Sequence, residues 1–157
     1  MIYANTASVG QLRAETRTNV LEFINSYKEN NFYISGYKTG CAKVEQCRQK
    51  ISELLHNKLN SVLLYSSTTD ALSILLSQLK LKEGSVVAIP KEYFPSIGGL
   101  KLSFEKMKYK VIEIGNYKGE IKVEDLQDLK IDLLLIEWVN YWNGHKNNLK
   151  KLSHWCR

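Results

Sequence analysis

The spacing of apolar residues predicts two helices at the start of the chain. Apolar side chains recur mostly at steps of three and four in the first stretch, which is the spacing of one helix face: Leu12, Val20, Phe23, Ile24 and Tyr27. Thr6 and Ser8 precede this stretch and can cap its free backbone N–H groups. A second apolar stripe, over residues 42–59, predicts a longer amphipathic helix. We expect a loop with Gly36 and Gly40 between the two helices.

After Asn60 the pattern changes to short apolar runs that alternate with helical stretches. Four runs predict strands, at residues 61–65, 85–90, 109–114 and 131–138. Helical patterns follow them at residues 68–79, 96–107, 124–129 and 149–155. Strands that alternate with helices are typical of βαβ units, and right-handed crossovers place the helices on both faces of the sheet. The predicted fold is α/β, with three α/β/α layers around a mostly parallel sheet at 61–157, preceded by a helical segment at 1–60.

The charge of the chain gives little support to a nucleic-acid partner. The 22 Lys and Arg residues exceed the 16 Asp and Glu residues by six. This excess is spread along the chain and consists mostly of lysine, whereas nucleic-acid-binding modules concentrate charge on one face and prefer arginine for bidentate contacts. We therefore expect a solvated lysine-rich surface and no nucleic-acid partner.

Composition also predicts the compartment. No apolar run approaches the roughly 20 residues of a membrane helix, and the first residues lack the features of a secretory signal. The three cysteines are odd in number and suggest no disulfide framework. His145, His154 and Cys156 match no standard zinc spacing, so we expect no metal site. These features predict a cytoplasmic protein without a membrane partner.

Candidate chemistry lies where the predicted strands end, because open α/β sheets bind ligands beyond the carboxyl ends of their strands. Four hydroxyl residues, 66–69, follow the first strand and begin a helix, whose free N–H groups favour an anion. Taken alone, this pattern is better explained by Ser67 or Thr68 capping its own helix. The chain contains no GxGxxG or GxxxxGK[ST] fingerprint, which argues against dinucleotide and P-loop nucleotide binding.

Two further segments supply an aromatic ring and hydrogen-bond donors. Phe94 follows the second strand, where its ring can stack on a flat ligand or pack beneath the next helix. Asn140 and Tyr141 follow the fourth strand and can donate to a ligand oxygen.

In their order these segments resemble the class V aminotransferase family, which are fold-type I enzymes that use pyridoxal 5′-phosphate. Residues 67–71 are similar to the family's Gly-Thr-Thr-Glu-Ala phosphate cradle, with serine in place of the glycine. Residues 92–96 resemble the stretch with the ring-stacking residue, and residues 139–144 resemble a V(Q/S)(Y/N)xxG segment. Weaker likenesses occur at residues 3–8, 40–55, 125–129 and 149–157.

The resemblance implies roles for six residues. Thr68 and Thr69, in a cradle with Ser67, would hold the cofactor phosphate. Phe94 would stack on the pyridine ring, and Tyr141, together with Asn140, would reach the ring hydroxyl. The substrate would be an amino acid.

The family's Schiff-base lysine and the aspartate that pairs with the pyridine nitrogen belong to motifs downstream of those found here, and the His145-Lys146 pair does not match the position of that lysine. The resemblance therefore implies the first part of a PLP-binding large domain, inactive by itself, that forms a homodimer or associates with a missing C-terminal half. Two alternatives are a non-catalytic α/β interaction module that pairs with a second chain, and a small α/β domain that binds another phosphate ligand through residues 67–69.

Overall fold

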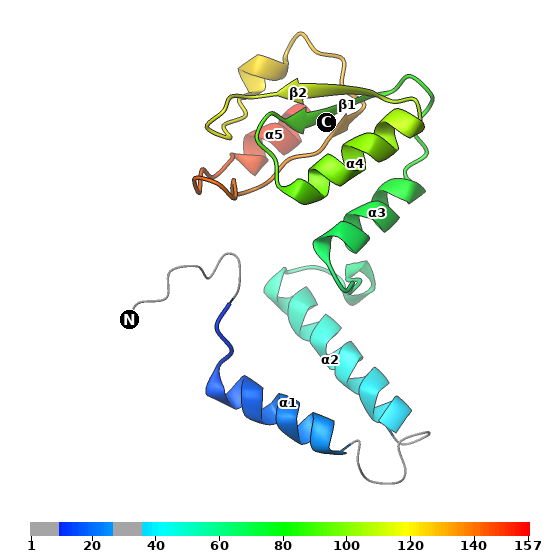
Figure 1. The fold of residues 1–157 in the computed structure, drawn as a ribbon, viewed down its shortest axis with the longest axis vertical. Coiled ribbons are helices and arrows are strands. Elements are labelled where there is room, and N and C mark those ends of the chain that lie inside the picture. Colours follow the sequence, from blue (N-terminus) through cyan, green and yellow to red (C-terminus); the bar gives the residue numbers. More distant parts are fainter. Residues whose placement is uncertain (1–9, 27–35) are drawn as a thin grey trace. The chain divides into compact units, whose positions relative to one another are not determined.

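The computed structural model describes residues 10–26 and 36–157 (Figure 1). The chain divides into two compact units, Met1–Leu64 and Tyr65–Arg157. Thr6, Ser8 and Tyr27, which the sequence analysis assigns to the first helix and its cap, lie outside the described residues.

The first unit contains two helices, as predicted, but the second begins and ends five residues earlier than the predicted range 42–59. They are α1 (Ala14–Ser26) and α2 (Tyr37–Leu54), and a short 3-10 helix, η2 (Leu59–Ser61), follows. The expected loop at Gly36 and Gly40 is wrong. Gly36 already has helical angles of φ −65° and ψ −40°, and Gly40 lies inside α2. Glycine adopts helical angles at a cost of only about 1 kcal/mol relative to alanine, so neighbouring helix-forming residues can carry a helix through it.

The strand predicted at residues 61–65 is wrong as well. Val62 has the extended angles φ −105° and ψ 119°, but no strand among the described residues pairs with this segment. Instead, Arg48 Nε donates to the carbonyl oxygen of Val62 over 2.9 Å. An apolar run becomes a strand only when a neighbouring strand satisfies its backbone, and here a side chain takes one of the acceptors.

The second unit contains a parallel sheet of three strands in the order β2-β1-β3. The strands are β1 (Val86–Pro90), β2 (Lys110–Ile114) and β3 (Leu133–Leu134). The α/β class and the parallel pairing are therefore confirmed. The fourth predicted strand is shorter than expected, because its pairing with β1 extends only over Leu133 and Leu134, opposite Val87 and Ala88.

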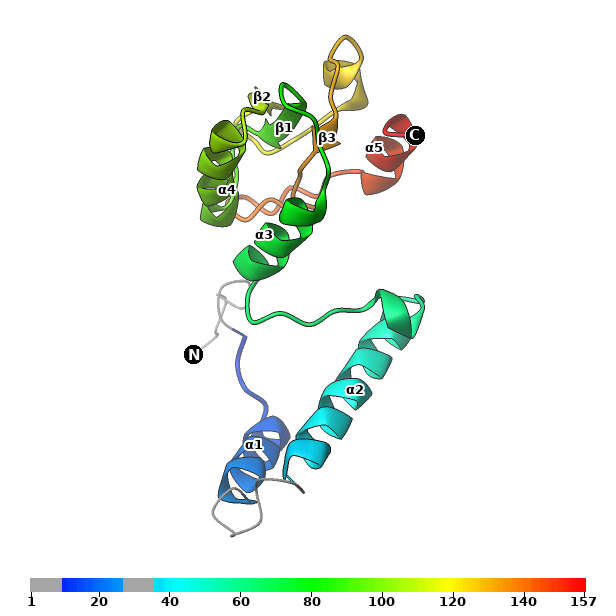
Figure 2. The same ribbon diagram turned by 90° about the vertical axis from the view of Figure 1, so that its right-hand side faces the viewer.

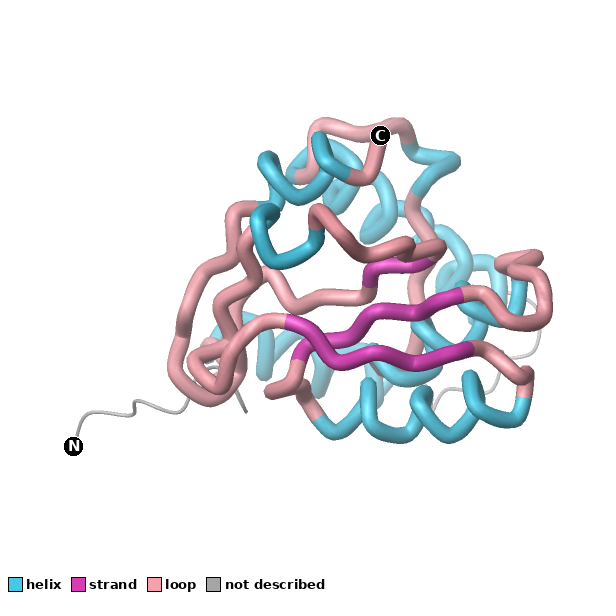
Figure 3. Tube along the Cα trace, turned by 90° about the horizontal axis from the view of Figure 1, so that it is seen from above, coloured by secondary structure: helices cyan, strands magenta, loops and turns pink. Residues whose placement is uncertain are grey.

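Helices cover both faces of this sheet (Figures 2 and 3). On one face, α3 (Thr68–Gln78) and α4 (Pro95–Lys106) pack against Val87 and Ile89 of β1. On the other face, η3 (Val123–Leu126) and α5 (Leu149–Trp155) pack around Ala88. Successive residues of a strand point to opposite faces, so β1 is the centre of both clusters.

Within the described ranges, no helix is long and apolar enough to cross a membrane.

Candidate functional site

The candidate site lies at the carboxyl ends of β1 and β3. After β1 the chain passes through α4 to β2, which pairs with one edge of β1. The other neighbour of β1, on its opposite edge, is β3. The segments that follow β1 and β3 therefore begin next to each other and then diverge, which is the position where open α/β sheets bind ligands. A hydrogen bond of 2.5 Å from the Phe94 N–H to Glu137 Oε1 joins the two segments.

Ser67 caps the start of α3. Its backbone is extended, and its hydroxyl oxygen accepts the N–H of Asp70 over 3.1 Å. The Ser66 hydroxyl donates to the carboxylate of Asp70. Hydrogen bonds from Ser66 and, to a smaller extent, Ser67 lower the pKa of Asp70 below its ordinary value. The capping role that the sequence allowed for Ser67 is therefore present in the structure.

Thr69 connects the start of α3 to the start of α4. Its hydroxyl donates to the hydroxyl oxygen of Ser96 over 3.0 Å, across 27 residues of sequence. Thr68 and Thr69 occupy the first turn of α3, and the N–H groups of a first turn have no acceptor within the helix. Two hydroxyls and the beginnings of two helices thus meet near the end of β1.

Phe94 and Tyr141 form an aromatic pair. Their ring centroids are 5.4 Å apart, the rings are nearly perpendicular at 86°, and each residue is 48% exposed. Phe94 therefore lies at the surface, not beneath α4 as the alternative interpretation required. Both rings retain open surface that a flat ligand can contact.

Asn140 has a different position from the other five candidates. It is only 3% exposed, and its side-chain oxygen accepts the N–H groups of Trp142 (3.0 Å) and Asn143 (3.2 Å). Its amide nitrogen donates to the carbonyl oxygen of Glu92 over 3.5 Å. Gly119 approaches so closely that a Cβ there would lie 2.5 Å from the amide nitrogen of Asn140. The amide of Asn140 closes its own turn and does not face the open surface.

Glu137 is a site residue that the sequence analysis missed. Its second oxygen, Oε2, accepts the N–H of Tyr141 over 3.4 Å, so one carboxylate contacts the backbone of both ring residues. The available signal was a carboxylate near the carboxyl end of the apolar run of residues 131–138, where the ligand-binding rule places functional groups.

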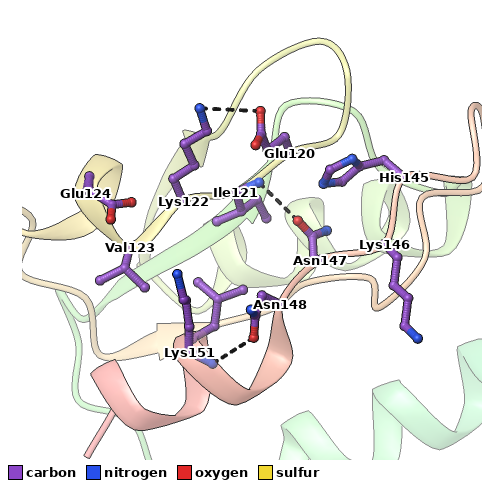
Figure 4. Close-up of a pocket in the computed structure, with 11 residues that line it drawn as sticks. Glu120, Ile121, Lys122, Val123, Glu124, His145, Lys146, Asn147, Asn148 and Lys151 are labelled. Carbon is purple, nitrogen blue, oxygen red and sulfur yellow. Dashed lines mark hydrogen bonds and ion pairs between the residues drawn. The ribbon is translucent and has the colours of Figure 1, made fainter.

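A separate groove of about 300 Å³ lies between residues 120–124 and 145–152 (Figure 4). None of the six candidate residues lines it. Lys122 is paired with Glu120 over 3.6 Å, and Figure 4 shows Lys146 pointing away from the groove. The buried side chain of Asn147 holds the groove together, because it bonds to Ile121 N, Gly119 O and Glu137 O.

Within the part of the chain that the structure describes, no three His, Cys, Asp or Glu side chains are placed to hold a metal ion.

Comparisons with protein-family models, curated proteins and solved structures found no match to this chain.

Proposed function

We propose that residues 65–157 form the phosphate- and ring-binding part of a pyridoxal 5′-phosphate site of the class V aminotransferase type. The hydrogen bond between Thr69 and Ser96 carries this proposal. It joins the segment that resembles a phosphate cradle to the segment that resembles the ring-stacking stretch. A phosphorylated aromatic ligand needs both, since its phosphate requires donors and its ring requires an apolar face.

The donors and rings of the described residues fit such a ligand. Thr68 offers a hydroxyl, and Thr68 and Thr69 offer first-turn N–H groups, which suit a phosphate at the start of an 11-residue helix. The Thr69 hydroxyl donates to Ser96, whose own hydroxyl hydrogen is left to donate to the same phosphate. The half-exposed ring of Phe94 offers a stacking surface, and the phenol of Tyr141 can reach a ring hydroxyl. In this proposal Asn140 shapes the turn that carries Tyr141 and does not itself contact the cofactor.

The proposal assigns binding, and no turnover, to these residues. The bound cofactor would supply the electron-withdrawing ring on which amino-acid chemistry depends. The family's motifs for the Schiff-base lysine and the ring-nitrogen aspartate have no counterpart among the 157 residues. A separate chain that carries these two motifs would complete a catalytic site.

The test uses 4′-deoxypyridoxine 5′-phosphate, which has the phosphate and the ring but no aldehyde. Surface lysines therefore cannot react with it covalently. Binding is followed by the fluorescence of Trp138 and Trp142, which flank Tyr141 closely in sequence. We expect saturable binding, which weakens about 10-fold or more in the Thr68→Ala/Thr69→Ala variant because hydrogen bonds to a charged group are lost. We expect Phe94→Ala to weaken it as well.

Ser77→Ala is the matched control, because Ser77 lies near the opposite end of α3, where its hydroxyl donates to the carbonyl oxygen of Ile74 and accepts from the amide of the neighbouring Gln78. Its affinity should equal that of the original chain. Absence of saturable binding, or unchanged affinity in the double threonine variant, would refute the proposal. If inorganic phosphate binds as tightly as the analogue and Phe94→Ala has no effect, the chain is instead a domain for another phosphate ligand.

A further inference from the structure

We propose that Glu137 is a positioning residue that holds Phe94 and Tyr141 at the separation a ring ligand requires. This inference rests on the function proposed above, because it concerns how the same site is assembled.

Glu137 contacts the backbone of both ring residues. Oε1 accepts the N–H of Phe94 over 2.5 Å, and Oε2 accepts the N–H of Tyr141 over 3.4 Å. The first contact spans 43 residues of sequence. Because both donors are backbone groups, the carboxylate fixes the positions of the main chain and leaves the two rings free to contact a ligand.

Glu137 also satisfies one of the free backbone N–H groups at the start of α4. Phe94 is the N-cap residue of α4, and its own side chain makes no capping hydrogen bond. A carboxylate near the start of a helix is favourable, since it lies at the positive end of the helix dipole. The contact from Glu137 thus stabilises the turn that presents Phe94.

The remaining polar contact described between these two segments is weaker. It is the hydrogen bond from the Asn140 amide to Glu92 O, at 3.5 Å, which lies at the outer limit for such bonds. A hydrogen bond to an ionised carboxylate is roughly twice as strong as one between neutral groups. The 5.4 Å spacing of the Phe94 and Tyr141 rings therefore depends mainly on Glu137.

Glu137→Gln tests this role with almost no change in size. An amide offers one acceptor oxygen and turns its NH₂ group toward the other N–H, so one of the two backbone contacts must be lost. We expect the Phe94 amide proton to move upfield and exchange faster in NMR spectra of the full chain. We also expect the nuclear Overhauser effect between the Phe94 and Tyr141 rings to weaken, and analogue affinity to fall about 10-fold.

Asp132→Asn is the matched control. Asp132 Oδ2 accepts the N–H of Val86 over 2.7 Å, so a carboxylate holds a backbone amide at the opposite end of β1. We expect this variant to lose stability without any change in the ring contact or the affinity. Glu137→Asp retains the charge but is one methylene shorter, and it should give an intermediate ring contact if Glu137→Gln folds poorly.

Two results would overturn the inference: an unchanged ring contact in Glu137→Gln, or an equal loss of that contact in Asp132→Asn. The ring contact is measured without ligand. If the original chain fails to bind the analogue, the proposed function fails, while the ring contact still decides the role of Glu137.

Discussion

A single amide, that of Asn147, joins three segments of the second unit. Asn147 is 4% exposed, accepts the N–H of Ile121 over 3.0 Å, and donates to Gly119 O and Glu137 O over 3.1 Å each. Asn147→Ala would leave these three backbone groups without a partner in a region that water reaches poorly. We expect the free energy of unfolding, measured by urea titration, to fall by about 2–4 kcal/mol.

Asn143 provides the control for this prediction. It has the same side chain, accepts the N–H of His145 over 2.9 Å and donates to Lys118 O over 2.6 Å, but it is exposed. Water can replace both bonds, so Asn143→Ala should cost no more than about 1 kcal/mol. Equal losses in the two variants would show that burial does not determine the contribution of Asn147.

At the scale of elements, the stability of the start of α3 should depend on pH through the carboxyl group of Asp70. Hydrogen bonds from Ser66 and Ser67 lower the pKa of this carboxyl below its ordinary 3.8 in the folded chain. As the pH falls, the unfolded chain therefore takes up this proton first. The stabilising contribution is complete above the unfolded pKa and disappears as the pH falls through the folded pKa.

Asp70→Asn should remove this part of the acid dependence of stability, which urea titrations between about pH 2 and 6 would measure. An NMR titration of the Asp70 carboxyl should give a midpoint below 3.8. A midpoint at or above that value, or an unchanged pH dependence in the variant, would contradict the hydrogen bonds from Ser66 and Ser67.

The elements that could be predicted from the sequence are those with local signals. The helix start at Ser67 has a capping hydroxyl, and α4 begins with Pro95, a residue suited to the first turn. β1 is an apolar run that is buried on all sides. It has a neighbouring strand on each side and helices on each face. Residues 61–65 have the same pattern without a neighbouring strand, and no local pattern reveals that difference.

The same distinction applies to the site. The rule that ligands bind at the ends of strands placed Phe94 and Tyr141 at one edge of the sheet. The role of Glu137 depends on a contact across 43 residues, which the sequence does not encode locally. The bonds from Asn140 to the N–H groups two and three residues ahead are local, and the Asn-x-x-Asn-Gly pattern of residues 140–144 could have indicated such a turn.

For the whole molecule, the buried apolar residues are distributed unevenly. In the described part of the first unit, Val62 is the one buried apolar residue. The two core clusters lie in the second unit, between Val87 and Leu152. Helix α1 contains no buried residue. An isolated helix of 13 residues is only marginally stable in water, because most helix stability in proteins comes from packing.

We therefore predict a gradient of hydrogen exchange along the full chain. Amides of β1 should exchange only through global unfolding, whereas those of α1 should exchange at least about a hundredfold faster through local opening. Exchange measured by NMR at several protein concentrations tests this prediction.

If α1 is as protected as β1 at every concentration, the prediction is wrong, because the second unit's core would then not be the main source of stability. If protection of α1 rises with concentration, a second copy covers the exposed Val20, Leu21 and Ile24, which would favour the interaction module that the sequence left open.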